Sequence, residues 1–184
     1  MKARALQWLA QREHSRIELR RKLLSHVRAQ DAAARATEQA APAQPDVDGA
    51  DPSDASGVPD AIARVEAVLD WLEAHQYLSH ERFAEARVHA RASRFGNLRI
   101  RQELAQHEVT LSPETTQALK DNELARARSV WERKYSGTPV TAAERARQAR
   151  FLSSRGFTAD VIRQVLREAG RHKTDATEPV SADD

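Results

Sequence analysis

Residues 145–166 read RARQARFLSSRGFTADVIRQVL and contain the local signals of a helix, a sharp turn and a second helix. Gly156 stands where the first helix would end, because glycine tolerates the left-handed backbone that closes many helices. Thr158 follows as a helix N-cap, and Ile162 and Leu166 then recur with the spacing of one helix face. The stretch therefore predicts two helices that meet at Gly156.

Two patterns from this stretch occur at two other places, so the fold is expected to repeat. In the first pattern a leucine precedes the residue that closes the turn by five positions, as in the pairs Leu72 and Tyr77, Leu104 and Val109, and Leu152 and Phe157. A cap follows each pair: Ser79, Ser112 and Thr158. The second pattern is cap–x3–apolar–Arg–x2–apolar, beginning at Ser15, Gly96 and Thr158. Three small tandem units fit this pattern, each too small to be stable without its neighbours.

The composition favours helices throughout the 184 residues. Ala, Arg, Leu and Glu dominate, whereas glycine and proline number only 6 and 7, so about nine helices and no strand are expected. Apolar stripes at helical spacing are formed by Ile62, Val65, Leu69 and Leu72, and by Phe83, Ala86 and Ala90. Residues 3–28 predict two helices with Ser15 as the second cap. Ser112 and Thr141 are expected to cap later helices.

Several classes of function are disfavoured. The chain has no cysteine, which excludes disulfides and thiolate metal sites. Its seven histidines form no metal-ligand spacing, and no phosphate-binding glycine loop is present, so neither a metal, a cofactor nor ATP hydrolysis is expected. No signal-peptide core or membrane-spanning apolar run occurs, so we expect a cytoplasmic protein with no membrane partner.

The charge is unevenly distributed along a chain whose formal net charge is only +2. Residues 31–60 hold seven acids against Arg35, and residues 171–184 hold four acids against Arg171 and Lys173. The other residues therefore carry a net charge of +10. A basic body of this kind predicts a polyanionic partner, because cationic side chains that neutralise phosphates release counterions.

Residues 30–60 are rich in Ala, Pro, Asp and Ser and lack regularly spaced apolar residues. Such a segment cannot bury enough surface to offset its ordering entropy, so we expect a disordered acidic loop in the first repeat, and a disordered acidic tail over 171–184. The loop is either a tolerated insertion, since loop length costs little, or a competitor of nucleic acid for the basic body.

Residues 85–103, EARVHARASRFGNLRIRQE, hold an unusual run of arginines: Arg87, Arg91, Arg94, Arg99 and Arg101. The first three share a helix face, beside the stripe of Phe83, and the last two begin the next helix. Without a neighbouring acid, such a run favours a polyanion or an acidic protein surface as its partner. The alternative is a solvated face paired to distant acids such as Glu66 or Glu73.

The chain also resembles the RecX family of bacterial regulators of the recombinase RecA. The matching stretches are REHSRIELRRKL at 12–23, VLDWLEAHQYLSHERFAEARV at 68–88, GNLRIRQELAQHEV at 96–109 and RARQARFLSSRGFTADVIRQVL at 145–166. Two departures are visible. The family commonly places glycine before the residue that closes a helix, which Gly156 retains but Gln76 and Glu108 do not, and the 31–60 insertion is longer than usual.

The resemblance implies an all-α fold of three tandem three-helix repeats in an elongated, curved molecule. We expect the repeats over 1–78, 79–121 and 122–170. The resemblance further implies a non-enzymatic regulator that lies in the groove of RecA filaments on single-stranded DNA and inhibits strand exchange and ATP hydrolysis. It would thereby modulate recombination and the SOS response. We expect a monomer, with free DNA as a further candidate partner.

The candidate residues for binding RecA or DNA are basic: Arg20, Arg21, Lys22, Arg87, Arg91, Arg94, Arg99, Arg101, Arg145, Arg147, Arg150, Arg155 and Arg163. The recurring Arg20, Arg101 and Arg163 mark either a binding groove or a position at the core edge that tolerates a long side chain. Guanidinium groups suit phosphate and carboxylate alike, so residue type does not choose between DNA and RecA. The aromatic residues on apolar stripes, Trp8, Trp71, Trp131, Phe83, Phe151 and Phe157, are expected to pack in the core rather than stack on bases.

Two other functions remain open from the residues. A helix-turn-helix repressor, or a non-specific nucleic-acid-binding protein, also has basic helices. A repressor concentrates its base-reading side chains on one recognition helix, whereas arginine is spread over all three expected units here. A scaffold for other proteins would show no salt-dependent binding to nucleic acid.

Overall fold

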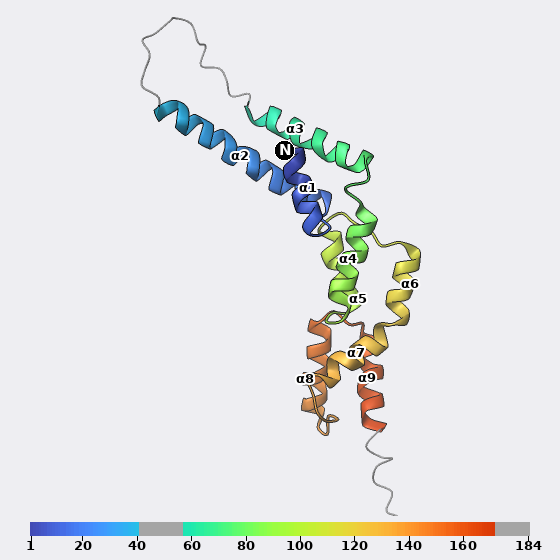
Figure 1. Cartoon of the computed structure of the whole chain (residues 1–184). Coiled ribbons are helices and arrows are strands. Elements are labelled where there is room, and N and C mark those ends of the chain that lie inside the picture. The colour runs from blue at the N-terminus through green and yellow to red at the C-terminus, as the bar shows by residue number, and fades with distance from the viewer. Residues whose placement is uncertain (41–56, 172–184) are drawn as a thin grey trace, which may run out of the picture. The chain divides into compact units, whose positions relative to one another are not determined.

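The computed structural model describes residues 1–40 and 57–171, and all nine elements in them are helices, as predicted (Figure 1). The expected disorder of residues 41–56 and 172–184 lies outside the described residues. The chain divides into two compact units, Met1–Phe83 and Ala84–Asp184, with the boundary inside one helix. In the described part of the chain, no helix is both long and apolar enough to cross a membrane.

The first unit is built on an apolar core between α1 (Lys2–Gln11), α2 (Arg16–Ala40) and α3 (Gly57–Ala74). Figure 1 shows α2 and α3 side by side, and these two helices pack against each other. They supply the core residues Leu19, Leu23, Val27, Val65, Leu69 and Leu72, each of which stabilises the fold by about 1.5–3 kcal/mol when buried. Ser15 caps α2 as predicted, because its hydroxyl accepts a hydrogen bond from the Glu18 backbone N–H at 3.1 Å.

Helix α2 continues through Ala40 instead of ending near residue 30, so the expected loop boundary is wrong. The extra residues read DAAARATEQA, which contains no glycine or proline and is rich in alanine, the strongest helix former. The composition of residues 31–60 taken together hides this boundary, because the prolines begin only after Ala40. Helix α3 also begins earlier than residue 60, at Gly57.

The acids of α3 are already paired within the first unit. Arg16 contacts Glu66, Asp70 and Glu73 at 2.7 Å each, and Arg20 also contacts Glu66. Burial acts to raise the pKa of Glu66, but hydrogen bonds from Arg16 and Arg20 outweigh it and hold that pKa below its usual value. Glu66 and Glu73 therefore form ion pairs with Arg16 and Arg20, and not with the arginine run of residues 85–103.

The second unit contains the larger part of α4 (His80–Ala92), followed by α5 (Asn97–Ala105), α6 (Pro113–Asp121), α7 (Glu123–Glu132), α8 (Ala142–Ser154) and α9 (Ala159–Arg171). Helices α7, α8 and α9 enclose its core, which includes Val130, Trp131, Leu152, Phe157, Ile162 and Leu166. The predicted caps are confirmed at Ser112 and Thr141. Their hydroxyls accept hydrogen bonds of 3.1 Å from the backbone N–H groups of Thr115 and Glu144.

The predicted repeat is confirmed in three matching turns, which follow α3, α5 and α8. The backbone N–H groups of Tyr77, Val109 and Phe157 donate to the carbonyls of Leu72, Leu104 and Leu152 at 2.9, 3.1 and 3.2 Å. The residue before each closing residue has a positive φ: 58° at Gln76, 56° at Glu108 and 82° at Gly156. This is the Schellman geometry. The turns are therefore the same even where glycine is missing.

Glycine at the first two turns should stabilise the protein. We expect Gln76→Gly and Glu108→Gly each to raise the free energy of unfolding by about 0.5–1 kcal/mol, because a left-handed backbone costs an L-residue more than the added unfolded-state entropy of glycine. Urea unfolding measures the change. The control is Ala63→Gly at an exposed position inside α3, which should lower stability by about 1 kcal/mol. A loss in all three variants would contradict the expectation.

Candidate interface: an arginine cluster around Phe95

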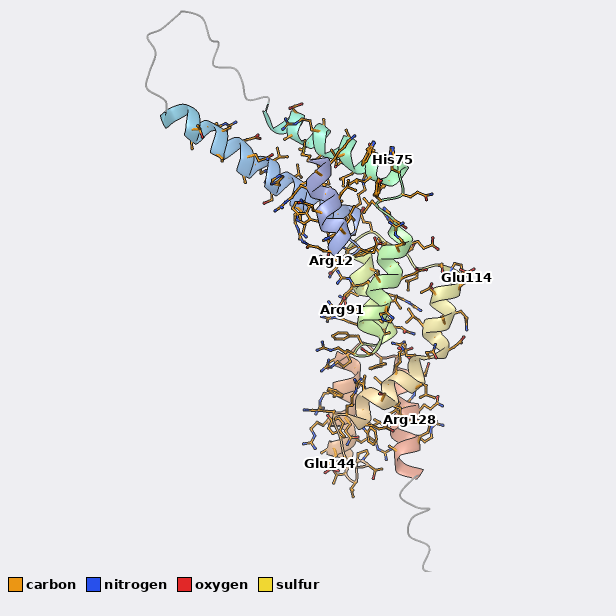
Figure 2. The ribbon with its side chains drawn as sticks, in the orientation of Figure 1. Arg12, His75, Arg91, Glu114, Arg128 and Glu144 are labelled. Carbon is orange, nitrogen blue, oxygen red and sulfur yellow. The ribbon has the colours of Figure 1, made fainter. Side chains whose placement is uncertain are left out.

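Four arginines surround the ring of Phe95, which lies between α4 and α5. The guanidinium carbons of Arg91, Arg94, Arg99 and Arg155 are 5.6, 5.9, 5.9 and 5.6 Å from the ring centroid. These distances lie within the range of a cation–π interaction. Figure 2 marks Arg91 on α4. We call these five residues the Phe95 cluster. It joins three members of the arginine run to Arg155, which the sequence places far away.

Arg155 is positioned between two aromatic rings. Its guanidinium carbon is 5.6 Å from the Phe95 centroid and 5.3 Å from the Phe151 centroid. Tyr135 contacts Phe151 edge-on, with the ring centroids 5.6 Å apart and an interplanar angle of 85°. A guanidinium held on ring faces has already lost much of its side-chain freedom, so less entropy remains to be lost when it binds an anion.

The cluster divides into paired and acid-free arginines. Glu103 contacts Arg91 Nε at 2.9 Å and Arg99 Nε at 3.6 Å. Arg94 and Arg155 form no ion pair with any described residue. The expectation that the run lacks a neighbouring acid is therefore wrong for two of its members. Glu103, the last residue of the run itself, is the acid in question.

The buried face of α4 also differs from the expected stripe. Ala86 and Ala90 are exposed, whereas Ala84 is buried and Arg87 and Arg91 are half-buried. Alanine carries so little apolar surface that it cannot indicate which face of a helix is buried. The buried face of α4 therefore includes Arg87, whose Nη2 lies 3.5 Å from Nε2 of His107 in the turn after α5.

A groove of 250 Å³ beside the cluster carries only positive charge. It is lined by Arg94, Val130, Arg133, Lys134, Phe151 and Arg155, all of them described residues and none of them acidic. Arg133 is oriented by backbone carbonyls, since its Nη2 donates to Ser93 at 2.5 Å and its Nε to Ser129 at 3.2 Å. We call these six residues the acid-free groove.

A buried polar network holds the turn that carries Phe95. The backbone N–H and the Nδ2 of Asn97 donate to the carboxylate of Glu123 at 3.1 and 3.0 Å. Arg126 donates to Asn97 Oδ1 at 2.5 Å and to the carbonyl of Phe95 at 2.9 Å. Burial lowers the pKa of Arg126, while the charge of Glu123 acts to raise it. Asn97 and Glu123 are only 2% and 4% exposed, so water cannot reach their polar atoms, and these hydrogen bonds within the protein satisfy them instead.

Two glycines bring Arg155 to Phe95. The Gly96 N–H donates to the Arg155 carbonyl at 2.9 Å, and the Leu98 N–H donates to the Gly156 carbonyl at 3.0 Å. A Cβ on Gly96 would lie 2.3 Å from the Gly156 oxygen, and one on Gly156 would lie 2.5 Å from Arg99 Cβ. The turn after α8 therefore lies directly on the N-terminus of α5, and only glycine allows this approach at either position.

The other predicted site residues do not join the cluster. Arg101 is exposed on α5, Arg145, Arg147 and Arg150 are exposed on α8, and Arg163 pairs with Asp160 of its own helix. In the first unit, Arg20 pairs with Glu66, Arg21 is exposed, and Lys22 lies 5.2 Å from the Trp8 ring. A binding role for these residues stays a prediction.

Five residues of the site were not predicted as binding residues: Phe95, Val130, Arg133, Lys134 and Phe151. Phe95 belongs to no apolar stripe and stands inside the arginine run directly before Gly96, which was the available signal. Arg133 and Lys134 follow the end of α7, and nothing in their local sequence distinguishes them from other basic pairs. The aromatic residues that were expected in the core are buried or half-buried.

The helices and the site define the class of protein: an all-helical chain of small three-helix units with a cationic, aromatic surface. Comparison with known proteins agrees with this description of three-helix units. The family model described as "RecX, second three-helix domain" matches residues 79–110, and "RecX, third three-helix domain" matches residues 121–166.

Relatives that match over most of their length are described as RecX proteins. The chain is 40% identical to "Regulatory protein RecX" of Ralstonia nicotianae over 98% of this chain and 94% of that protein. It is 43% identical to the protein of that name from Leptothrix cholodnii, over 92% of this chain and 88% of the relative. The corresponding protein of Pseudomonas syringae pv. tomato is 36% identical, over 90% and 89%. The chain belongs to the RecX family of regulatory proteins.

The buried network should be essential to the second unit. Asn97→Ala leaves a carboxylate and a guanidinium without their shared partner, so we expect a loss of about 2–4 kcal/mol in the free energy of unfolding. The control is Asn122→Ala, because Asn122 is exposed and bonds only the Ala118 carbonyl through its side chain. Its loss should stay within about 0.5 kcal/mol. Equal losses in urea unfolding would show that Asn97 has no special role.

Proposed function

We propose that this protein binds RecA filaments on single-stranded DNA and inhibits their ATP hydrolysis and strand exchange. It would in this way modulate recombination and the SOS response. In this proposal the protein is a non-enzymatic monomer that acts in the cytoplasm. Membership of the RecX family supports the regulatory role. The observation that carries the proposed mode of binding is the Phe95 cluster with its two acid-free arginines.

The cluster suits the surface of such a filament. Single-stranded DNA presents phosphates and a protein surface presents carboxylates, and both are ligands of guanidinium groups. Arg94 and Arg155 have no acidic partner among the described residues, whereas Arg91 and Arg99 share the carboxylate of Glu103. We therefore propose the acid-free side of the cluster as the contact surface in the second unit.

The three-repeat organisation is part of the same proposal. Repeats over 1–78, 79–121 and 122–170 would each end a helix in one of the three Schellman turns. The hydrogen bonds at Val109 and Phe157 support the second and third repeats, because each closes the middle helix of its repeat, whereas the bond at Tyr77 closes the last helix of the first. Tandem repeats spread their contacts along an extended partner, which suits a regulator of a filament.

A DNA-binding repressor is the second candidate, and the basic surface alone is compatible with it. A repressor would read base edges from one recognition helix and prefer one duplex sequence. The acid-free arginines instead come from residues near the ends of two different helices, α4 and α8. Mobility shift with random and selected duplexes would separate the two, since a regulator of filaments should not select a sequence.

We expect the purified protein to inhibit the DNA-dependent ATPase of RecA at ratios from substoichiometric to equimolar. The variant Arg94→Ala/Arg155→Ala should need about tenfold more protein for half-inhibition, because two charge-assisted contacts together account for about 1.4 kcal/mol or more. Far-UV circular dichroism would verify that the helices are retained.

The control Lys120→Ala/Arg167→Ala removes the same charge from two exposed positions of the second unit. It should inhibit like the unaltered protein. Absence of inhibition by the unaltered protein would refute the proposed function. Equal weakening of both double variants would mean that only net charge matters and would remove the cluster from the mechanism.

A further inference from the structure

We propose that the acid-free groove binds the phosphodiester backbone of single-stranded nucleic acid, with Arg94 and Arg155 as the principal phosphate contacts. This inference rests on the proposed function, which brings a single strand next to the protein. It assigns one ligand chemistry, phosphate rather than carboxylate, to one defined surface.

The first argument is the concentration of unneutralised charge. Arg94, Arg133, Lys134 and Arg155 line a groove of only 250 Å³, and none of its lining residues is acidic. Like charges held this close repel one another and destabilise the folded chain. An external anion reverses that repulsion, so the groove is arranged for a ligand of high negative charge density.

The second argument is the preorganisation of the donors. Arg155 lies between the rings of Phe95 and Phe151, and Arg133 is held by the carbonyls of Ser93 and Ser129. A guanidinium has five N–H donors in a planar fork, and Arg133 uses only its Nε and Nη2 in these bonds. Among the described residues, no hydrogen bond uses the side chains of Arg94 or Arg155, so their forks remain available for phosphate oxygens.

The third argument separates phosphate from carboxylate. Elsewhere in the Phe95 cluster, the one carboxylate of Glu103 contacts both Arg91 and Arg99. Four cations without an acid need several negative charges within one small groove. A nucleic-acid strand supplies a charge at every nucleotide on one continuous chain, whereas a protein would have to hold several mutually repelling carboxylates together. Aromatic rings interleaved with cations are also the usual lining of single-strand sites.

The test is the binding of a labelled oligothymidylate to the full chain without RecA, followed by fluorescence anisotropy over a series of salt concentrations. On a single strand the logarithm of the binding constant falls with the logarithm of salt by about 0.7 for each phosphate neutralised. Arg94→Ala/Arg155→Ala should therefore reduce the magnitude of that slope by about 1.4. The charge-matched Lys120→Ala/Arg167→Ala should leave the slope unchanged.

A second variant guards against misfolding. Arg94→Ala/Lys134→Ala changes two exposed residues of the same groove, and it should reduce the slope by the same amount of about 1.4. An unchanged slope in both groove variants would overturn the inference, and so would an equal reduction in the Lys120→Ala/Arg167→Ala control.

Competition identifies the ligand chemistry. Inorganic polyphosphate should displace the labelled oligothymidylate, and polyglutamate at the same concentration of charge should displace much less. Equal displacement would overturn the assignment of phosphate and favour an acidic protein surface.

The outcomes also separate this inference from the proposed function. A reduced salt slope of oligothymidylate binding in the groove variants, with no RecA inhibition by the unaltered protein, would uphold the phosphate site and refute the RecA proposal. Inhibition of RecA by a protein whose groove variants bind the oligothymidylate normally would refute the phosphate site alone.

Discussion

The contact between the backbones of Gly96 and Gly156 is the constraint on which the second unit depends. It places the end of α8 on the start of α5, where the carbonyls of Arg155 and Gly156 accept the first N–H groups of that helix. A helix N-terminus normally needs a side-chain cap for these donors. Here the neighbouring turn accepts from Gly96 and Leu98, and the Glu123 carboxylate accepts from Asn97 between them, so the same contact that begins α5 also carries Arg155 to Phe95. The network of Asn97, Glu123 and Arg126 secures the same turn from the other helices.

Electrostatic pairing, rather than the number of arginines, determines which part of the surface is available. The run of residues 85–103 looks uniform in sequence, yet Glu103 engages Arg91 and Arg99 and leaves Arg94 acid-free. Arg155 then adds a second acid-free guanidinium from a distant part of the chain. Aromatic faces orient these groups at low cost, because a planar guanidinium can lie on a ring and keep its edge donors exposed. The combination yields a small surface of fixed positive charge within an almost neutral protein.

The repeated turns show how a local geometry persists without its usual residue. Gln76 and Glu108 adopt the left-handed backbone that glycine adopts at Gly156, and the closing hydrogen bonds keep their lengths within a few tenths of an ångström. Buried leucines at Leu72, Leu104 and Leu152 precede all three turns. Their packing outweighs the backbone strain at two positions. At Gly156 the close approach of Arg99 leaves no space for a side chain, which explains why glycine is retained there.

Much of the fold could be predicted from the sequence alone, because it depends on signals between residues close together in the chain. Caps such as Ser15, Ser112 and Thr141, the turn at Gly156 and the apolar spacing act within a few residues, so the helices and their repetition could be predicted. The buried face of α4 and the length of α2 could not be predicted, because alanine fits either a buried face or a solvent-exposed helix. The sequence also identified the basic residues as candidates. Only the tertiary structure decided which arginines contact Phe95, which of them contact Glu103, and which line one groove. Ion pairs and ring contacts depend on distances in space, and those between α4, α5, α7 and α8 are set by packing rather than by separation along the chain.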